Sequence, residues 1–365
     1  MNKKLLLLAG ILVLGATTFA ADAPAMTAER AAKISTITDS SAIEGLVATR
    51  QTGDAGFSGS YAGEVKVIMN QGPGRSDKNK DVKGYTGTSP DNYANSANKI
   101  EWTVGKGKVS MGKLGFIYDV DRDYNFDKNW NKTNEGWDTE FGLDYQGGTF
   151  DMMGKEWTFV PSVAFGYDKT EMYTSNASNP SARDNTTKKL FKFNPKISTT
   201  YYGFAMDISP IIAYDRISET TAFQLDISNY RKLGTEGLWS MYGDIYFDFA
   251  GTEKNDSYAN DVFNGKIDKD NKFAFSIEQY LGYEREITGN VYFTTEFGLE
   301  AYSLLQGANN SADMYVKPEM QYRANLGDAN ITPYVAYKTW TATDGMKDSV
   351  SKNELSVGVR FGTKF

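Results

Sequence analysis

The chain has 365 residues, a formal net charge of -7 at pH 7, and neither cysteine nor histidine. Without cysteine there are no disulfides or thiolate metal sites, and without histidine there is no imidazole-bound zinc or haem and no Ser-His-Asp catalysis. The acidic balance argues against a nucleic-acid partner, because neutralising phosphates requires clustered basic residues. We therefore expect no cofactor, no metal and no enzyme, although a carboxylate-based active site is an alternative that composition leaves open.

The first residues of the chain have the pattern expected of a leader. A basic start at residues 2–4 precedes an apolar run from Leu5 to Leu14, and small residues follow up to Ala20. This order is typical of a secretory signal peptide, and the apolar run is shorter than the ~20 residues that a membrane-spanning helix needs. We predict a cleaved signal peptide over residues 1–20 and export of the rest of the chain.

The next segment, residues 21–56, differs in pattern from the remainder of the chain. Thr27 is suited to cap a short helix from Ala28 to Ile34, and polar residues continue to Ser41. An N-terminal periplasmic extension, a small plug inside a lumen and an unstructured tail are the alternatives that the sequence leaves open.

From Phe57 onward, apolar and polar residues alternate in one segment after another. Alternation with a period of two predicts strands that have one apolar face. The last segment shows it most clearly, with apolar residues at every second position or nearly so: Leu355, Val357, Val359, Phe361 and Phe365. We count about 14 such segments, at residues 57–70, 98–105, 108–121, 136–146, 156–172, 188–201, 203–217, 222–233, 238–250, 271–287, 291–304, 312–326, 331–341 and 355–365.

The connections between these segments alternate in length. Tight turns are expected at residues 105–107, 234–237, 288–290 and 327–330, and long polar loops at residues 71–97, 122–135, 173–187, 251–270 and 342–350. Short periplasmic turns and long extracellular loops are typical of transmembrane β-barrels. A sheet in hydrocarbon must also close, because its edge amides find no partners there. We predict an all-β fold over residues 57–365, an antiparallel up-and-down barrel with an even number of strands.

Four tryptophans support this topology. Trp137 and Trp340 fall near the extracellular strand ends, and Trp157 and Trp239 fall near the periplasmic ones. Because tryptophan is enriched at membrane interfaces, these positions predict two aromatic girdles.

The leader, the alternating strands and the closing residues 357–365 together resemble the Gram-negative outer-membrane porins, and the strand count resembles the monomeric porin of the outer membrane protein G type. The likeness covers Phe57 to the end of the chain. It implies a place in the cell outer membrane, contact with its lipid and lipopolysaccharide, and passive diffusion of ions and small hydrophilic solutes through a monomer or homotrimer. It also implies that Phe361 and Phe365 are read by the barrel-assembly machinery.

If the apolar parity faces lipid, the other parity lines the lumen, and it is rich in charge. The predicted pore-lining acids are Asp138, Glu140, Asp144, Asp207, Asp215, Asp244, Asp248, Glu278, Glu284, Glu296 and Glu300. The predicted pore-lining bases are Lys66, Lys192, Lys196, Lys317, Arg323, Lys338 and Arg360, and three further acids share their parity: Glu64, Glu101 and Glu319. A dry core could not hold so many ions, because each unpaired buried ion costs several kcal/mol. The pattern therefore predicts a water-filled lumen.

The predicted charges are unevenly spread. Acids concentrate on the strands between residues 203 and 304, and bases on those between residues 312 and 360, which Lys66 joins when the barrel closes. This predicts a field across the pore and a weak preference for cations. The alternative is that neighbours such as Glu319, Arg323 and Lys338 neutralise one another.

Two other functions stay open. A substrate-specific transporter is favoured by tyrosines of lumen parity that could form an aromatic track, at Tyr280, Tyr292, Tyr302, Tyr315 and Tyr334. A surface adhesin or receptor that uses the barrel as an anchor would bind through the long polar loops.

Overall fold

The computed structural model describes residues 57–70, 98–126, 130, 132–173, 183–217, 219–234, 238–250, 273–302, 311–344 and 348–364. The predicted signal peptide, the segment 21–56, the loops 71–97 and 251–270, and Phe365 lie outside these residues. Within the described part of the chain, no helix is long and apolar enough to cross a membrane.

The described residues form one sheet of 16 strands. In chain order the strands are β1 (Phe57–Asn70), β2 (Asn98–Met111), β3 (Leu114–Phe126), β4 (Lys132–Tyr145), β5 (Thr149–Met152), β6 (Lys155–Tyr173), β7 (Arg183–Tyr201), β8 (Phe204–Asp215), β9 (Thr220–Leu233), β10 (Trp239–Ala250), β11 (Phe273–Thr288), β12 (Val291–Tyr302), β13 (Ser311–Tyr322), β14 (Ala324–Leu326), β15 (Ala329–Asp344) and β16 (Asp348–Lys364).

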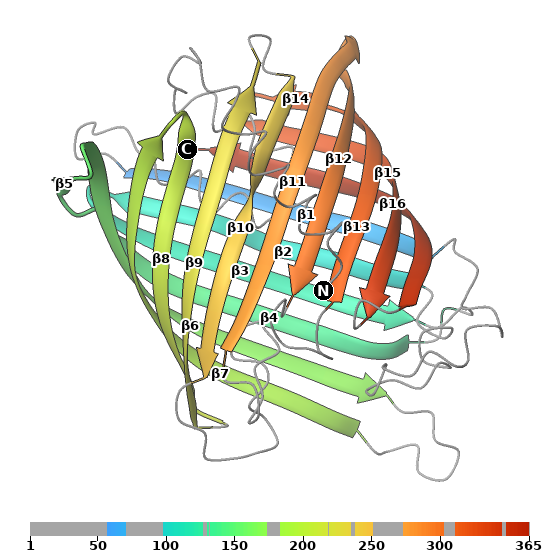
Figure 1. The fold of residues 1–365 in the computed structure, drawn as a ribbon. Helices are drawn as coiled ribbons and strands as arrows, with labels where there is room; N and C mark the ends of the chain where they lie inside the picture. Colours follow the sequence, from blue (N-terminus) through green and yellow to red (C-terminus); the bar gives the residue numbers. More distant parts are fainter. Residues whose placement is uncertain are drawn as a thin grey trace.

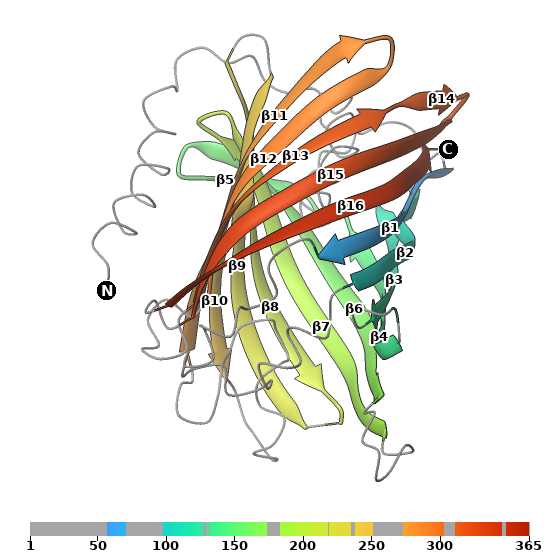
Figure 2. The same cartoon turned by 90° about the vertical axis from the view of Figure 1, so that its right-hand side faces the viewer.

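This sheet closes into a barrel (Figures 1 and 2). Strands that follow one another in the chain pair antiparallel, and β1 pairs with β16 from Ser60↔Lys364 to Asn70↔Glu354. Two short strands are not counted as separate strands of the wall. β5 folds back on β6, and β14 continues the line of β13 along β15. The remaining 14 strands form the wall. The predicted closed, antiparallel up-and-down barrel with an even number of strands is confirmed.

The barrel has two different ends. We call the "turn end" the one with the connections at residues 112–113, 153–154, 202–203, 234–238, 289–290 and 327–328. We call the "loop end" the one with the connections at residues 71–97, 127–131, 174–182, 216–219, 251–272, 303–310 and 345–347. The predicted turns at residues 288–290 and 327–330 lie at the turn end. Phe57 and Lys364 lie there too, as an even number of strands requires.

One predicted turn is wrong. Residues 105–107 do not turn, because β2 continues through them with a bulge between Thr103 and Gly105, and the chain turns at Gly112 (φ 57°) instead. The glycines serve close packing. A Cβ on Gly105 would lie 2.7 Å from the Tyr61 ring, and one on Gly107 would lie 2.1 Å from the Ser60 carbonyl oxygen.

Two predicted long loops are also wrong in their extent. Most of residues 122–135 belong to β3 and β4, and most of residues 342–350 belong to β15 and β16, which stay paired as far as Asp344↔Asp348. These strand ends are rich in polar residues, although Tyr124 and Phe126 continue the outer parity of β3, so their pattern is weaker than that of a strand in lipid. We infer that they project beyond the apolar band.

The outer face of the barrel is apolar. Large side chains on it are strongly exposed, among them Phe165 at 63%, Leu143 at 53% and Val335 at 49%. Others on the same face are Val65, Phe141, Phe191, Phe193, Ile212, Phe223, Phe297, Met314, Val357 and Val359. A soluble protein does not leave so large an apolar surface uncovered, whereas a membrane barrel requires an apolar band of this kind. The wall therefore faces hydrocarbon.

The tryptophans fit the predicted girdles only in part. Trp137 near the loop end and Trp239 at the turn end are both 38% exposed on the outer face, and Trp239 contacts the Tyr283 ring with centroids 4.8 Å apart. Trp157 contradicts the prediction, because it is buried and donates from Nε1 to the Met152 carbonyl oxygen at 3.0 Å. The β5–β6 hairpin supplies that acceptor. The side chain of Trp340 lies outside the described residues.

The packing of Gly107 can be tested. The Ser60 carbonyl belongs to the backbone of the neighbouring strand and cannot turn aside, so Gly107→Val should destabilise the folded barrel by about 1–3 kcal/mol. Gly148→Val is the control, since no atom lies within 4 Å of a Cβ there. Urea unfolding in lipid vesicles would measure both. Equal stability of the two variants would contradict the packing described for β1 and β2.

Candidate functional site in the barrel interior

The interior face of the barrel is charged. Every predicted pore-lining residue lies on the parity that alternates with the exposed apolar face of its strand. Asp144, for example, is 6% exposed and lies between Leu143 and Tyr145 on the outer face. Lys192 lies in the same way between Phe191 and Phe193. The part that these residues take in conduction stays a prediction.

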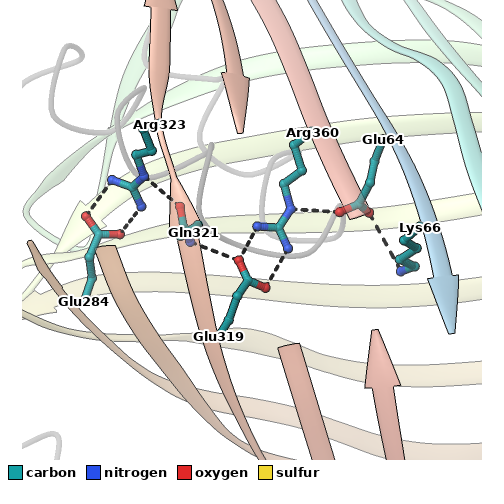
Figure 3. Close-up of polar contacts among 7 residues, drawn as sticks. All are labelled: Glu64, Lys66, Glu284, Glu319, Gln321, Arg323 and Arg360. Carbon is teal, nitrogen blue, oxygen red and sulfur yellow. Dashed lines mark hydrogen bonds and ion pairs between the residues drawn. The ribbon is translucent and has the colours of Figure 1, made fainter. Parts of the chain in front are cut away.

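One set of charges forms a chain along the inner wall at β11, β13, β16 and β1 (Figure 3). We call it the "ion-pair belt"; its members are Glu284, Arg323, Gln321, Glu319, Arg360, Glu64 and Lys66. Arg323 binds both carboxylate oxygens of Glu284 at 3.1 and 2.8 Å, and donates from Nε to Gln321 at 2.7 Å. Gln321 in turn donates to Glu319 at 3.0 Å.

The belt continues across the closure of the barrel. Arg360 binds both oxygens of Glu319, at 2.5 and 2.9 Å, and donates from Nε to Glu64 of β1 at 2.8 Å. Lys66 lies 3.8 Å from Glu64 and also pairs with Glu101 on β2. Two-pronged arginine–carboxylate pairs are strong and directional. The belt therefore ties the first strand to the last through side chains as well as through the backbone.

Aromatic rings support the two arginines. The guanidinium of Arg323 lies 3.9 Å from the centroid of Tyr292, and that of Arg360 lies 3.9 Å from the centroid of Tyr334. Such contacts add cation–π stabilisation and fix the planes of the guanidinium groups. Tyr292 and Tyr334, which the sequence suggested for an aromatic track, therefore serve the belt.

The belt changes the predicted charge distribution. Arg323, Arg360 and Lys66 are three of the bases predicted to form a basic wall, and each is paired with carboxylates. The alternative of neutralisation between neighbours is correct for these three bases, although Arg323 pairs with Glu284 instead of Glu319. The ammonium of Lys338 lies 3.7 Å from the centroid of the Tyr315 ring.

A second group of pairs lies on the wall from β2 to β8. Lys192 pairs with Glu140 at 2.5 Å, Lys196 with Asp207 at 3.2 Å, and Lys106 with Asp119 at 2.7 Å. Lys108 pairs with Asp144. The sequence prediction missed Lys99, Lys106, Lys108 and Asp119 as interior residues. For the last three the reason is the turn that it placed at residues 105–107, whereas Lys99 shares the parity of its partner Glu101. A strand that continues through residues 105–107 with one bulge would have placed those three in the interior.

A third group joins tyrosines and acids on β10 to β13; we call it the "acid–tyrosine wall". The hydroxyls of Tyr242 and Tyr315 both donate to Glu296, the second at 2.6 Å. Tyr280 lies within hydrogen-bond distance of Glu278 and Glu300, at 3.4 and 3.3 Å. The ring of Tyr280 contacts those of Tyr242 and Tyr315, with centroids 5.2 and 6.2 Å apart.

Within this wall, acids face one another across strands. Asp244 lies directly opposite Glu278, and Glu278 lies directly opposite Glu300. Residues opposite one another in an antiparallel pair have Cβ atoms roughly 5 Å apart, and like charges there repel. We call these three residues the "acid row", since the register brings three carboxylates together on one part of the wall.

The two sides of the interior differ in access to water. Tyr242, Tyr280 and Tyr315 of the acid–tyrosine wall are at most 8% exposed, because they pack on one another as a layer. On the opposite side the carboxylate of Glu140 is 33% exposed and the ammonium of Lys192 is 29% exposed. The Glu140–Lys192 pair is thus more accessible to solvent than these three tyrosines.

Two predicted pore-lining acids have clear structural roles. Asp215 accepts hydrogen bonds from the backbone amides of Lys189 and Ile217, at 2.9 and 3.1 Å, and so holds the connection after β8. Asp248 is 1% exposed and accepts a hydrogen bond from Gln224 at 2.7 Å. In the described ranges, no group of three or more acidic side chains has the arrangement of a metal site.

The closed wall, the apolar exterior and the charged interior define the class of the protein as a transmembrane β-barrel. No model of a known protein family matches the chain, and no curated protein matches it either.

Solved structures match the chain at low similarity. CdiB from Escherichia coli has a TM-score of 0.43 and 7% identity, over 83% of this chain and 62% of that one, so this chain spans less than two thirds of it. The outer membrane channel DcaP of Acinetobacter baumannii has a TM-score of 0.36 and 10% identity, over 85% and 96% of the two chains. The outer membrane protein OpdK from Pseudomonas aeruginosa has a TM-score of 0.34 and 8% identity, over 85% and 99%. With TM-scores below 0.5 these likenesses carry no argument, and the class rests on the pairing and faces of the sheet itself.

The belt predicts unequal costs for two carboxylate substitutions. Glu319→Gln should lower the free energy of unfolding by about 1–3 kcal/mol, because it leaves Arg360 without its two-pronged partner at a position that is 5% exposed. Glu140→Gln removes one partner of a half-exposed pair and should cost less than about 1 kcal/mol. Urea unfolding in lipid vesicles would measure both. Similar losses would show that the belt adds nothing beyond an ordinary ion pair.

Proposed function

We propose that this chain is an outer-membrane porin through which ions and small hydrophilic solutes diffuse passively, with a weak preference for cations. The turn end faces the periplasm and the loop end faces the exterior. The leader at residues 1–20 directs export, and Phe361 and Phe365 guide assembly. The observation that carries the proposal is a charged interior enclosed by a wall whose outer face is apolar.

The charge of the interior supports a wet lumen. A sealed, dry barrel would have to bury more than a dozen ionic side chains from Glu64 to Arg360, with a desolvation cost of several kcal/mol for each ion. Partial exposure of the pairs on the β2–β7 side is consistent with water at that wall. Passive diffusion needs no more than such a lumen that is open at both ends.

The acid row supports the preference for cations. Asp244, Glu278 and Glu300 stand opposite one another on three consecutive strands, β10, β11 and β12. The belt, by contrast, alternates acids with bases and is close to neutral. Carboxylates gathered on one wall of a lumen attract cations and repel anions, which is how rings of charged side chains set selectivity in channels.

Single-channel recording tests the proposal. The refolded mature chain, residues 21–365, should give ohmic steps in a planar bilayer, and a salt gradient should produce a reversal potential of the sign for weak cation preference. A substrate-specific transporter would instead show current that saturates or is blocked by its solute. A correctly folded, heat-modifiable barrel that never conducts would contradict the porin proposal and favour the adhesin.

The acid row gives a sharper prediction. Glu278→Gln with Glu300→Gln should move the reversal potential toward zero, because it removes two negative charges from the lumen. Asp151→Asn with Glu156→Gln is the matched control: these acids lie opposite each other on the β5–β6 hairpin at the turn end and are exposed. The control should keep the wild-type reversal potential. An equal shift in both variants would place selectivity outside the acid row.

A further inference from the structure

The outer face carries a group of basic side chains beside the apolar band, at the loop end of β3 to β8. We call it the "outer basic patch"; its members are Arg122, Lys132, Lys189 and Arg216. Lys189 and Arg216 lie opposite each other, since the Arg216 amide donates to the Lys189 carbonyl oxygen at 3.0 Å, and both residues are exposed.

Their neighbours show that both point away from the lumen. Lys189 shares its parity on β7 with Phe191 and Phe193, which are 41% and 39% exposed. Arg216 continues the parity of Ile212 and Tyr214 on β8, which are 46% and 40% exposed. The two cations therefore stand directly beyond a surface that lies in hydrocarbon.

The other half of the patch is built on aromatic rings. The guanidinium of Arg122 lies 4.9 Å from the centroid of Tyr124 and 5.0 Å from that of Trp137, and the Lys132 ammonium lies 5.1 Å from Tyr124. Glu135 pairs with both bases, at 3.7 Å from Arg122. Among the described side chains of the patch, one acid thus pairs with two cations.

The two halves lie in adjacent rows of the sheet. Arg122 is opposite Trp137 on β4, and Lys189 is opposite Tyr167 on β6. From β3 to β7 the patch covers three strand spacings, or roughly 14 Å. The aromatic side chains of Trp137 and Tyr167 lie next to these bases, as is typical of a membrane interface.

We infer that the outer basic patch binds the phosphorylated head group of a membrane lipid. Two cations directly opposite each other on a sheet repel, and a phosphate between them would relieve the repulsion. Arg and Lys are the side chains best suited to bind phosphate oxygens. The apolar surface immediately below the patch requires a ligand that has acyl chains under its anionic head, which a soluble anion lacks.

The inference rests on the proposed function for its orientation, because the loop end faces the outer leaflet only if the barrel is in the outer membrane. The lipid of that leaflet is the lipopolysaccharide that the sequence already suggested as a partner. Diphosphorylated lipid A, its membrane anchor, is therefore the probe.

Native mass spectrometry of the barrel in detergent, titrated with diphosphorylated lipid A, tests the inference. Lys189→Glu with Arg216→Glu should weaken binding by about tenfold or more, because two charge-assisted contacts are lost. Lys155→Glu with Arg285→Glu is a charge-matched control at the turn end, where both residues are exposed, and it should bind as the wild type does. Dephosphorylated lipid A should bind all three proteins equally weakly.

Several outcomes would overturn the inference. Unchanged binding by the patch variant, or equal weakening in the control, would remove the lipid site from this face. Displacement of lipid A by inorganic phosphate at comparable concentration would indicate a site for soluble anions. If the reversed charges prevent folding, Lys189→Gln with Arg216→Gln replaces them. Conductance of the same proteins separates the lipid-binding proposal from the porin proposal. A patch variant that loses lipid binding but conducts like the wild type supports both proposals. A wild-type barrel that does not conduct contradicts the porin proposal alone.

Discussion

The structure depends on one constraint: each backbone amide in a hydrocarbon environment needs a hydrogen-bond partner within the protein. An open sheet would leave two edges without partners, so the first strand must find the last. The ladder from Ser60↔Lys364 to Asn70↔Glu354 meets that requirement. Once the wall closes, strict alternation assigns every residue to lipid or to the interior. A shift of one residue would turn each apolar face inward, so the register is fixed along the whole chain.

The interior depends on the same alternation. Its charges could not sit in a dry core, and they are arranged in three different ways around the wall. The ion-pair belt is almost neutral and joins the closing strands, the lysine pairs of β2 to β8 are partly exposed, and the acid–tyrosine wall gathers carboxylates on neighbouring strands. The contacts that join the closing strands, the paired charges and the gathered carboxylates thus lie in different parts of the barrel wall. The outer basic patch extends this division to the outer face, where its bases lie beyond the apolar band.

Much of the fold could be predicted because the alternation is local. Each of the predicted segments overlaps a strand, and residues 57–70 coincide with β1. The same alternation predicts which residues of each strand face the interior. The errors arise where another effect determines the structure. Gly105 and Gly107 suggest a turn, but they make room for Tyr61 and for the neighbouring backbone. Strand ends such as the Arg122 region are rich in polar residues, so their composition suggests loops.

The sequence alone could not predict which side chains pair between strands that are distant in the chain. Arg360 and Glu64 are 296 positions apart, and only the closed register brings them to 2.8 Å. The pairing of Arg323 with Glu284 likewise depends on which strands are neighbours. The burial of Trp157 depends on the hairpin that β5 adds at the turn end. Local pattern indicates the face of a residue, whereas the partner depends on strand tilt and stagger.

The measurement that tests the central claim most directly is reactivity of single cysteines at neighbouring positions in the lipid-embedded barrel. The chain has no cysteine of its own, so each introduced thiol is the sole target. The account predicts that Lys192→Cys reacts with a water-soluble, membrane-impermeant maleimide, while Phe191→Cys and Phe193→Cys do not. Equal reactivity at the three positions, or protection of position 192 alone, would contradict a water-filled interior enclosed by a lipid-facing wall.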